Sequence, residues 1–170
     1  MTDREVAVVT GTSSGIGLHT ALGLAHKGLR VVATMRDTGR SDALRAEAAR
    51  QGVDLTVRAL DVTDLDGARV CLDEVTAEFG PIDVLVNNAG SATFGTLEQL
   101  SDAALQKQLD VNFLGVAALT RHVLPTMRAS GAGRVVTVTS NGGVVREPFL
   151  DAYCDLDGSK VLGAMSPLLG

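Results

Sequence analysis

Three glycines close to the N-terminus have a spacing that could hold a phosphate group. Gly11, Gly15 and Gly17 follow the apolar run 6–9 and lead into a helical pattern. Glycine lets the chain turn tightly and bring N–H groups close to phosphate oxygens, and the N-terminus of a helix adds partial positive charge. The spacing departs from the common G-x-G-x-x-G fingerprint, so an ordinary turn between strand and helix stays open as the alternative. The residues that we expect at a nucleotide here are Gly11, Ser13, Ser14, Gly15, Ile16 and Gly17.

Alternating strand and helix patterns determine where this loop must lie. Short β-branched runs predict strands, and the segments between them predict helices, as in successive βαβ units. The strands are expected at 6–10, 31–35, 55–59, 84–87 and 135–139, and the helices at 16–27, 41–51, 65–79 and 101–129. We expect an α/β fold, a doubly wound parallel sheet of the Rossmann type with strand order 3-2-1-4-5. In that order, a ligand crevice forms at the carboxyl ends of the first and fourth strands, beside the glycines.

The helix expected at 101–129 carries two local signals. Ser101, followed by Asp102, is predicted to cap the N-terminus of this helix. Pro125 lies near its end, where a kink or an early stop is expected because proline cannot donate to the helix.

Further motifs, in the same order along the chain, resemble a known family. Asn87-Asn88-Ala89-Gly90 ends the fourth predicted strand, Asn112 lies in the long helix, and Ser140 precedes Tyr153 by thirteen residues. With the glycine loop, these residues resemble the short-chain dehydrogenase/reductase family. Segments 15–19, 33–37 and 148–154 look most like its branch of 17-beta-hydroxysteroid and retinol dehydrogenases.

The resemblance extends over residues 6–154 and degrades after them. It implies one NAD(P)-binding domain over residues 1–170 that lacks the family's C-terminal strands and substrate-binding segment. The sheet is therefore expected to be incomplete at the C-terminus, with the fifth strand as an exposed edge. The resemblance also suggests a homo-oligomer that forms through the long helices.

The end of the second strand predicts which dinucleotide binds. An acidic side chain there accepts hydrogen bonds from the ribose 2′-OH of NAD, whereas arginine pairs with the 2′-phosphate of NADP. Here Met35 takes the acidic position and Arg36 follows, which favours NADP over NAD; the alternative is a solvated charge that Asp37 neutralises. The resemblance places Asp61 and Val62 at the adenine, although Asp61 also suits the start of the next helix. It places Asn88, Ala89 and Gly90 along the cofactor.

Hydride transfer between nicotinamide and a carbonyl or secondary alcohol also needs a group that exchanges a proton with the substrate oxygen. The resemblance assigns this role to Tyr153. It assigns Ser140 to the substrate oxygen, and Asn112 to a relay water held through a local distortion of its helix. Because a tyrosine pKa is about 10, the phenolate needs a positive charge nearby. In the family, a lysine four residues after the tyrosine supplies that charge.

This sequence departs from the family at that lysine. Asp157 stands four residues after Tyr153, and the first lysine beyond it is Lys160. On a regular helix, Lys160 would lie one turn too far, and the Asp157 carboxylate would raise the tyrosine pKa. If 155–157 loop out, Gly158 supplies the flexibility and Lys160 can reach the site.

Composition restricts the partners. The formal net charge is −5 and there is no basic stripe, so we expect a small-molecule substrate, no nucleic acid and no membrane surface as partner. The polar N-terminus and the short apolar run behind it predict neither a signal peptide nor a membrane segment, hence a cytoplasmic location. Cys71 and Cys154 predict no disulfide framework, and together with the dispersed histidines they offer no metal-ligand spacing.

The expected function is an oxidoreductase that moves a hydride between NADP(H) and a carbonyl or secondary alcohol, steroid-like or retinoid-like. Two alternatives stay open. One is a dinucleotide-binding module without turnover, because Asp157 occupies the lysine position. The other is a truncated or frame-shifted product that barely folds. A methyltransferase of related fold is disfavoured by the pair Ser140 and Tyr153.

Overall fold

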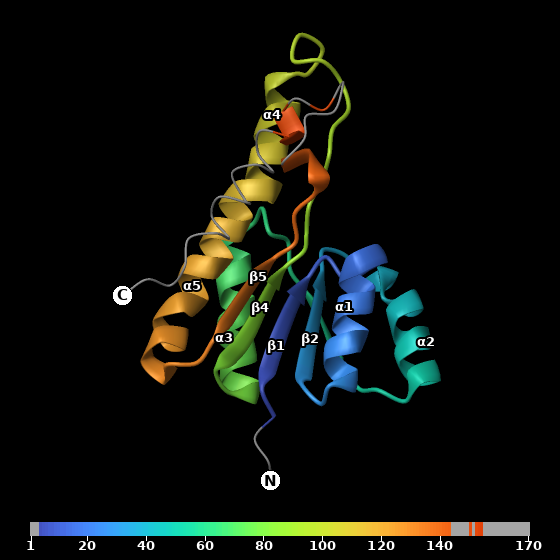
Figure 1. The fold of residues 1–170 in the computed structure, drawn as a ribbon, viewed down its shortest axis with the longest axis vertical. Coiled ribbons are helices and arrows are strands. Elements are labelled where there is room, and N and C mark those ends of the chain that lie inside the picture. The colour runs from blue at the N-terminus through green and yellow to red at the C-terminus, as the bar shows by residue number, and fades with distance from the viewer. Residues whose placement is uncertain (1–3, 144–149, 151, 155–170) are drawn as a thin grey trace.

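The computed structural model describes residues 4–143, 150 and 152–154, and it contains one five-stranded sheet (Figure 1). The strand order is β3-β2-β1-β4-β5, and every neighbouring pair is parallel, as the alternation of strand and helix patterns predicted. The strands are β1 (Val6–Thr10), β2 (Arg30–Met35), β3 (Thr56–Ala59), β4 (Ile82–Asn87) and β5 (Arg134–Thr137). The fifth strand was expected to reach residue 139. It ends at Thr137, although Val138 N still donates to Asn87 O at 2.9 Å.

The helices cover both faces of the sheet (Figure 1). They are α1 (Gly15–His26), α2 (Asp42–Gln51), α3 (Leu65–Phe79), α4 (Asp102–Leu109) and α5 (Gly115–Ser130). Short 3-10 turns, η1 (Thr38–Arg40) and η3 (Asn141–Gly143), follow β2 and β5. The helix expected at 101–129 contains a π-helical segment, η2 (Asp110–Leu114), between α4 and α5. Ser101 caps α4 by accepting from Ala104 N at 3.2 Å, as predicted, and α5 continues past Pro125, so the proline does not end it.

Alternate side chains of the strands build two apolar layers, because successive strand residues point to opposite faces. On one face, Val8, Leu85 and their neighbours pack against α3 and α5. On the other face, Val9 and Ala33 pack against α1 and α2. A fully buried valine or leucine stabilises the fold by about 1.5–3 kcal/mol, so the layers hold the carboxyl ends of the strands in fixed positions.

The pairing of β1 with β4 joins the first part of the sheet to the second, and side chains reinforce both of its ends. At the start of β1 the register shifts between Val6 and Ala7, and Val6 N donates to Asp83 Oδ2 at 2.8 Å. At the end of β1, the hydroxyl of Thr10 accepts from the backbone N–H groups of Asn88 and Ala89, both at 3.0 Å.

Both cysteines are buried in the fold, and two of the histidines form hydrogen bonds near the surface. Cys71 and Cys154 are buried, and burial raises the pKa of the Cys71 thiol. His26 bonds Gln51 and His122 bonds Asp73, both near the surface. Across the described residues, no cluster of these side chains with carboxylates could hold a metal ion, and none of the helices is long and apolar enough to span a bilayer.

Candidate functional site

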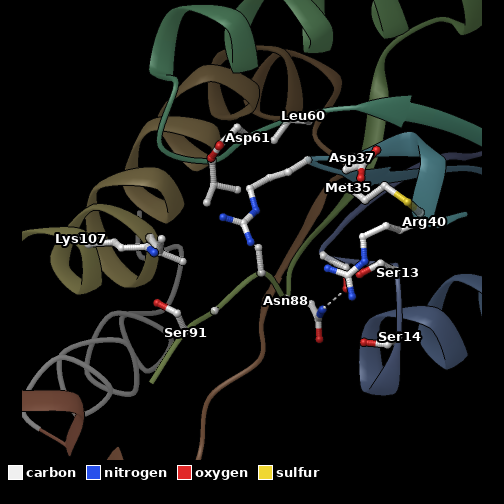
Figure 2. A pocket seen from close by; sticks show the side chains of 16 residues that line it. Ser13, Ser14, Met35, Asp37, Arg40, Leu60, Asp61, Asn88, Ser91 and Lys107 are labelled. Atoms are coloured by element: carbon white, nitrogen blue, oxygen red, sulfur yellow. Dashed lines mark hydrogen bonds between the residues drawn. The ribbon is translucent and has the colours of Figure 1, made fainter. Parts of the chain in front are cut away.

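A pocket of about 580 Å³ opens at the carboxyl ends of the central strands (Figure 2). The loops after β1, β2, β3 and β4 supply most of its lining, and α4 and η2 close one side. It is lined by Gly11, Ser13, Ser14, Met35, Arg36, Asp37, Arg40, Leu60, Asp61, Val62, Asn88, Ala89, Gly90, Ser91, Lys107 and Val111. Most of the residues predicted to contact a nucleotide therefore share one cavity, at the place that the strand order predicts.

The glycine loop (residues 11–17) requires its glycines for two different reasons. Gly11 and Gly15 have positive φ values of 69° and 57°, which side chains rarely adopt. A Cβ on Gly17 would lie 2.3 Å from the carbonyl oxygen of Gly11, so the start of α1 packs directly on the loop. Nothing lies within 4 Å of a Cβ built on Gly15, and the loop is open there. Gly15, Ile16 and Gly17 are not part of the pocket lining, and Ile16 is 64% exposed.

Asn88 joins the glycine loop to the end of β4. Its Nδ2 donates to Thr10 O at 2.9 Å and to Gly11 O at 3.0 Å. Its own backbone N–H is held by the Thr10 hydroxyl, so the side chain and the main chain of Asn88 bind the same strand end. The predicted residue thus has a clear structural role, and it also lines the pocket.

Thr12 joins the loop to β2 in a similar way. Its backbone N–H and its hydroxyl both donate to Thr34 O, each at 3.1 Å. Thr34 in turn donates to Val9 O at 3.2 Å. The loop between β1 and α1 is therefore held by both neighbouring strands, and its backbone conformation is set before any ligand binds.

The end of β2 gives the pocket a basic wall. Met35 is 3% exposed and offers no polar group, whereas Arg36 is exposed and lines the cavity. Asp37 caps the following turn by accepting from Gly39 N at 2.9 Å. Among the described residues Arg36 has no ion-pair partner, so the predicted neutralisation by Asp37 does not take the form of a direct salt bridge.

Asp61 has a structural role at the start of α3 and also lines the pocket; its contact with the adenine stays a prediction. Its carboxylate accepts from Thr63 N at 2.9 Å and from the Thr63 hydroxyl at 2.7 Å, which shapes the entry to α3. The helix cap itself is Asp64, which accepts from Gly67 N at 3.1 Å. Asp61 and Val62 nevertheless line the pocket. Turn formation and a place in the pocket lining are therefore compatible.

Asn112 is fully buried in the π-helical segment η2. Its side chain holds Ser91 from both sides: Nδ2 donates to Ser91 O at 2.7 Å, and Oδ1 accepts from Ser91 N at 2.9 Å. One helical turn earlier, Gln108 Oε1 accepts from Thr93 N at 2.8 Å. A local distortion of the helix at Asn112 is present, and in this structure the Asn112 side chain positions the loop that lines the pocket after β4.

Ser140 and Tyr153 lie close to the same short turn. The Ser140 hydroxyl donates to Asn141 Oδ1 at 2.9 Å and accepts from Gly142 N at 3.3 Å. A Cβ on Gly142 would lie 3.1 Å from Cε1 of Tyr153, so the tyrosine ring packs on that turn. The two predicted catalytic residues are thus brought into one region. Lys160 and Asp157 lie outside the described residues.

Several residues of the pocket were not singled out from the sequence. Arg40, Ser91, Lys107 and Val111 carry no motif, because they come from a turn, a loop and a helix whose relative placement only the fold defines. The sequence held no signal for Lys107: Val111 lies four residues later, on the same helix face, but it carries no motif either.

Comparisons with known proteins agree with this geometry. The family model described as "short chain dehydrogenase" matches residues 5–160. Human retinol dehydrogenase 8 is 43% identical over 153 residues, covering 88% of this chain and 48% of that protein. Human 17-beta-hydroxysteroid dehydrogenase type 1 is 42% identical over 158 residues, covering 89% of this chain and 47% of that protein. The chain spans about half the length of these relatives.

Solved structures share the fold. Actinorhodin polyketide ketoreductase with NADPH superposes with a TM-score of 0.90 at 33% identity, over 96% of this chain and 63% of that one. A metagenomic short-chain oxidoreductase in complex with NADP gives a TM-score of 0.89 at 32% identity, over 96% of this chain and 76% of that one.

Proposed function

Because the chain belongs to the short chain dehydrogenase family, we propose that it binds NADP(H) and transfers a hydride between this cofactor and a carbonyl or secondary alcohol. The observation that carries the proposal is the pocket itself, which combines the glycine loop with the Arg36 wall. The expectation of a single domain over residues 1–170 is part of the same proposal.

The residues present fit a dinucleotide. Space for a ligand remains at Gly15, since no atom lies within 4 Å of a Cβ built there. At Gly17, by contrast, the helix packs so tightly on the loop that even a methyl group would meet the Gly11 carbonyl oxygen. Backbone N–H groups at the start of α1 can therefore approach a pyrophosphate closely, and the helix terminus favours negative charge there. When bound, the cofactor supplies or accepts the hydride.

The end of β2 supports NADP over NAD. Met35 is buried and apolar, so it offers no carboxylate to a ribose 2′-OH. Arg36 lines the pocket and has no ion-pair partner in the described part of the chain, which leaves its guanidinium available to a 2′-phosphate.

The substrate class is inferred from the relatives. Two of them are named for retinol and for a 17-beta-hydroxysteroid, both of which carry an alcohol on a large apolar body. We propose a steroid-like or retinoid-like substrate, with Tyr153 exchanging the proton at the substrate oxygen and Ser140 bonded to that oxygen. Asn112 positions the neighbouring loop, and Lys160 supplies the positive charge that favours the phenolate.

Removal of the Tyr153 hydroxyl tests this proposal. In Tyr153→Phe, carbonyl-dependent NADPH consumption should fall by at least about a hundredfold, since a positioned acid or base contributes about 10²–10⁴-fold. The NADPH dissociation constant from calorimetry should stay within twofold. The assay is run on the full chain with a panel of steroid and retinoid ketones and aldehydes.

A second candidate is a dinucleotide-binding module without turnover, favoured by Asp157 at the position of the family lysine. It predicts NADPH binding with no consumption on any member of the panel. Absence of binding to both NADPH and NADH would overturn both candidates. The cytoplasmic location and the homo-oligomer through the long helices stay predictions, to be checked by fractionation and by sedimentation.

A further inference from the structure

We propose that Arg40 is a second specificity-determining residue, which pairs with the 2′-phosphate of the cofactor together with Arg36. This inference rests on the proposed preference for NADP and names a residue that no motif in the sequence singles out. Arg40 lines the same pocket as Arg36 and the glycine loop. Figure 2 shows it on the side of the pocket that Ser13 and Ser14 line, with Lys107 on the other side.

The turn η1 fixes the backbone at Arg40. Arg40 N donates to Asp37 O at 3.1 Å, and the next N–H, of Ser41, donates to Thr38 O at 3.1 Å. Ser41 is 4% exposed and its carbonyl oxygen accepts from Arg45 N, so the turn continues directly into α2. The backbone of Arg40, four residues after Arg36, is therefore held in place at the pocket wall.

The two carboxylates that line the pocket, Asp37 and Asp61, form hydrogen bonds within their own turns. Asp37 accepts from Gly39 N within the turn, and Asp61 accepts from the N–H and hydroxyl of Thr63. Neither forms an ion pair with Arg36 or Arg40 in the described residues. Both guanidinium groups thus keep their donors for a ligand.

The charge balance of the pocket favours an anion. Three cationic side chains line it, Arg36, Arg40 and Lys107, against two carboxylates, although the chain as a whole carries a net charge of −5. A phosphate monoester carries about −1.5 to −2 charge near neutral pH, so one guanidinium leaves it incompletely neutralised. The Asp37 carboxylate adds to that deficit. A second guanidinium compensates for it and binds phosphate oxygens with more than one donor.

The test compares two ligands that differ only in the 2′-phosphate. Dissociation constants for NADPH and NADH are measured by calorimetry for the full chain and for Arg40→Ala, Arg40→Lys and Arg50→Ala. Arg50 is the control: it carries the same charge as Arg40 but lies near the C-terminal end of α2, where it pairs with Glu47 and does not line the pocket. We expect Arg40→Ala to weaken NADPH binding about tenfold and to leave NADH binding within twofold, because a charge-assisted pair contributes on that scale.

The remaining variants separate charge from geometry. Arg40→Lys should retain part of the NADPH preference, since lysine keeps the charge but not the fork of donors. Arg50→Ala should change neither constant, which excludes an effect of net charge alone. In Arg40→Ala the salt dependence of NADPH binding should also decrease.

Three other results of these binding measurements would each overturn a specific part of the proposal. A wild-type chain that binds NADPH and NADH equally, or binds neither, overturns the proposed NADP preference and with it the role of Arg40. A wild-type preference for NADPH that survives in Arg40→Ala overturns the role of Arg40 alone. Equal weakening of both ligands in Arg40→Ala would assign Arg40 to the fold of the turn, and it overturns the specificity role.

Discussion

At the residue scale, the glycine at position 17 is the most constrained point of the site. A Cβ there would lie 2.3 Å from Gly11 O and 2.4 Å from Asn88 Nδ2, and both atoms belong to the joined loops. Gly17→Ala should therefore destabilise the protein by about 1–3 kcal/mol and weaken NADPH binding, because the loop must move. Urea unfolding and calorimetry measure the two effects.

Gly23 provides the matched control on the same helix. Nothing lies within 4 Å of a Cβ built on Gly23, and its φ is not in the left-handed region. Gly23→Ala should stabilise the protein by about 0.5–1 kcal/mol, because alanine loses less backbone entropy in a helix interior. If both alanine variants behaved alike, close packing at Gly17 would not be the cause.

Residue types with a motif were predictable from the sequence, and the others were not. Gly11, Asn88 and Asp61 could be placed at the pocket because the strand order fixes where the carboxyl ends of their strands lie. Arg40 and Lys107 could not be placed, since an exposed cation in a turn or on a helix looks the same whether it faces solvent or a cavity.

At the element scale, the Thr10 hydroxyl holds the end of β1 to the chain that leaves β4. Thr10→Val keeps the shape of the side chain but leaves the N–H groups of Asn88 and Ala89 without their acceptor. We expect a loss of about 2 kcal/mol in the free energy of unfolding, measured with urea. Thr34→Val removes one hydrogen bond, to Val9 O, and should cost about 1 kcal/mol. Equal losses would contradict the role assigned to Thr10.

Helix and strand types were predictable from periodicity, whereas the distortion at Asn112 was expected only from the family resemblance and is present as η2. The periodic pattern over 101–129 predicted one helix, and a π-helical segment changes that apolar pattern too little to be recognised. The fifth strand was predicted too long because Val138 and Thr139 are β-branched, a preference that does not report where the pairing stops.

At the scale of the whole molecule, β5 forms an edge of the sheet within the described residues, where it pairs only with β4. Val136 on this strand is 48% exposed, and unpaired strand edges with apolar side chains promote self-association. Val136→Lys should reduce concentration-dependent association in sedimentation velocity and leave the thermal midpoint nearly unchanged. Val70→Lys, at a valine on α3 that is 56% exposed, should leave association as it is; a similar reduction there would assign the effect to charge alone.

The parallel sheet followed from the βαβ alternation because parallel crossovers allow few arrangements, and the expected strand order of the Rossmann type is the one observed. The arrangement of the catalytic residues was harder to predict from the sequence. The predicted lysine lies beyond the described residues. Two predictions therefore stay open: that Lys160 reaches Tyr153 and favours its phenolate, and that Asp157 opposes the phenolate.

The two reinforced ends of the β1–β4 pairing have a consequence for ligand affinity. Asp83 holds one end of that pairing, and Thr10 with Asn88 holds the other, where the glycine loop begins. The backbone of the glycine loop is thus pre-organised, and little conformational freedom is left for a ligand to remove. Less of the free energy of contact with the cofactor is then lost to ordering this loop, which favours tighter binding.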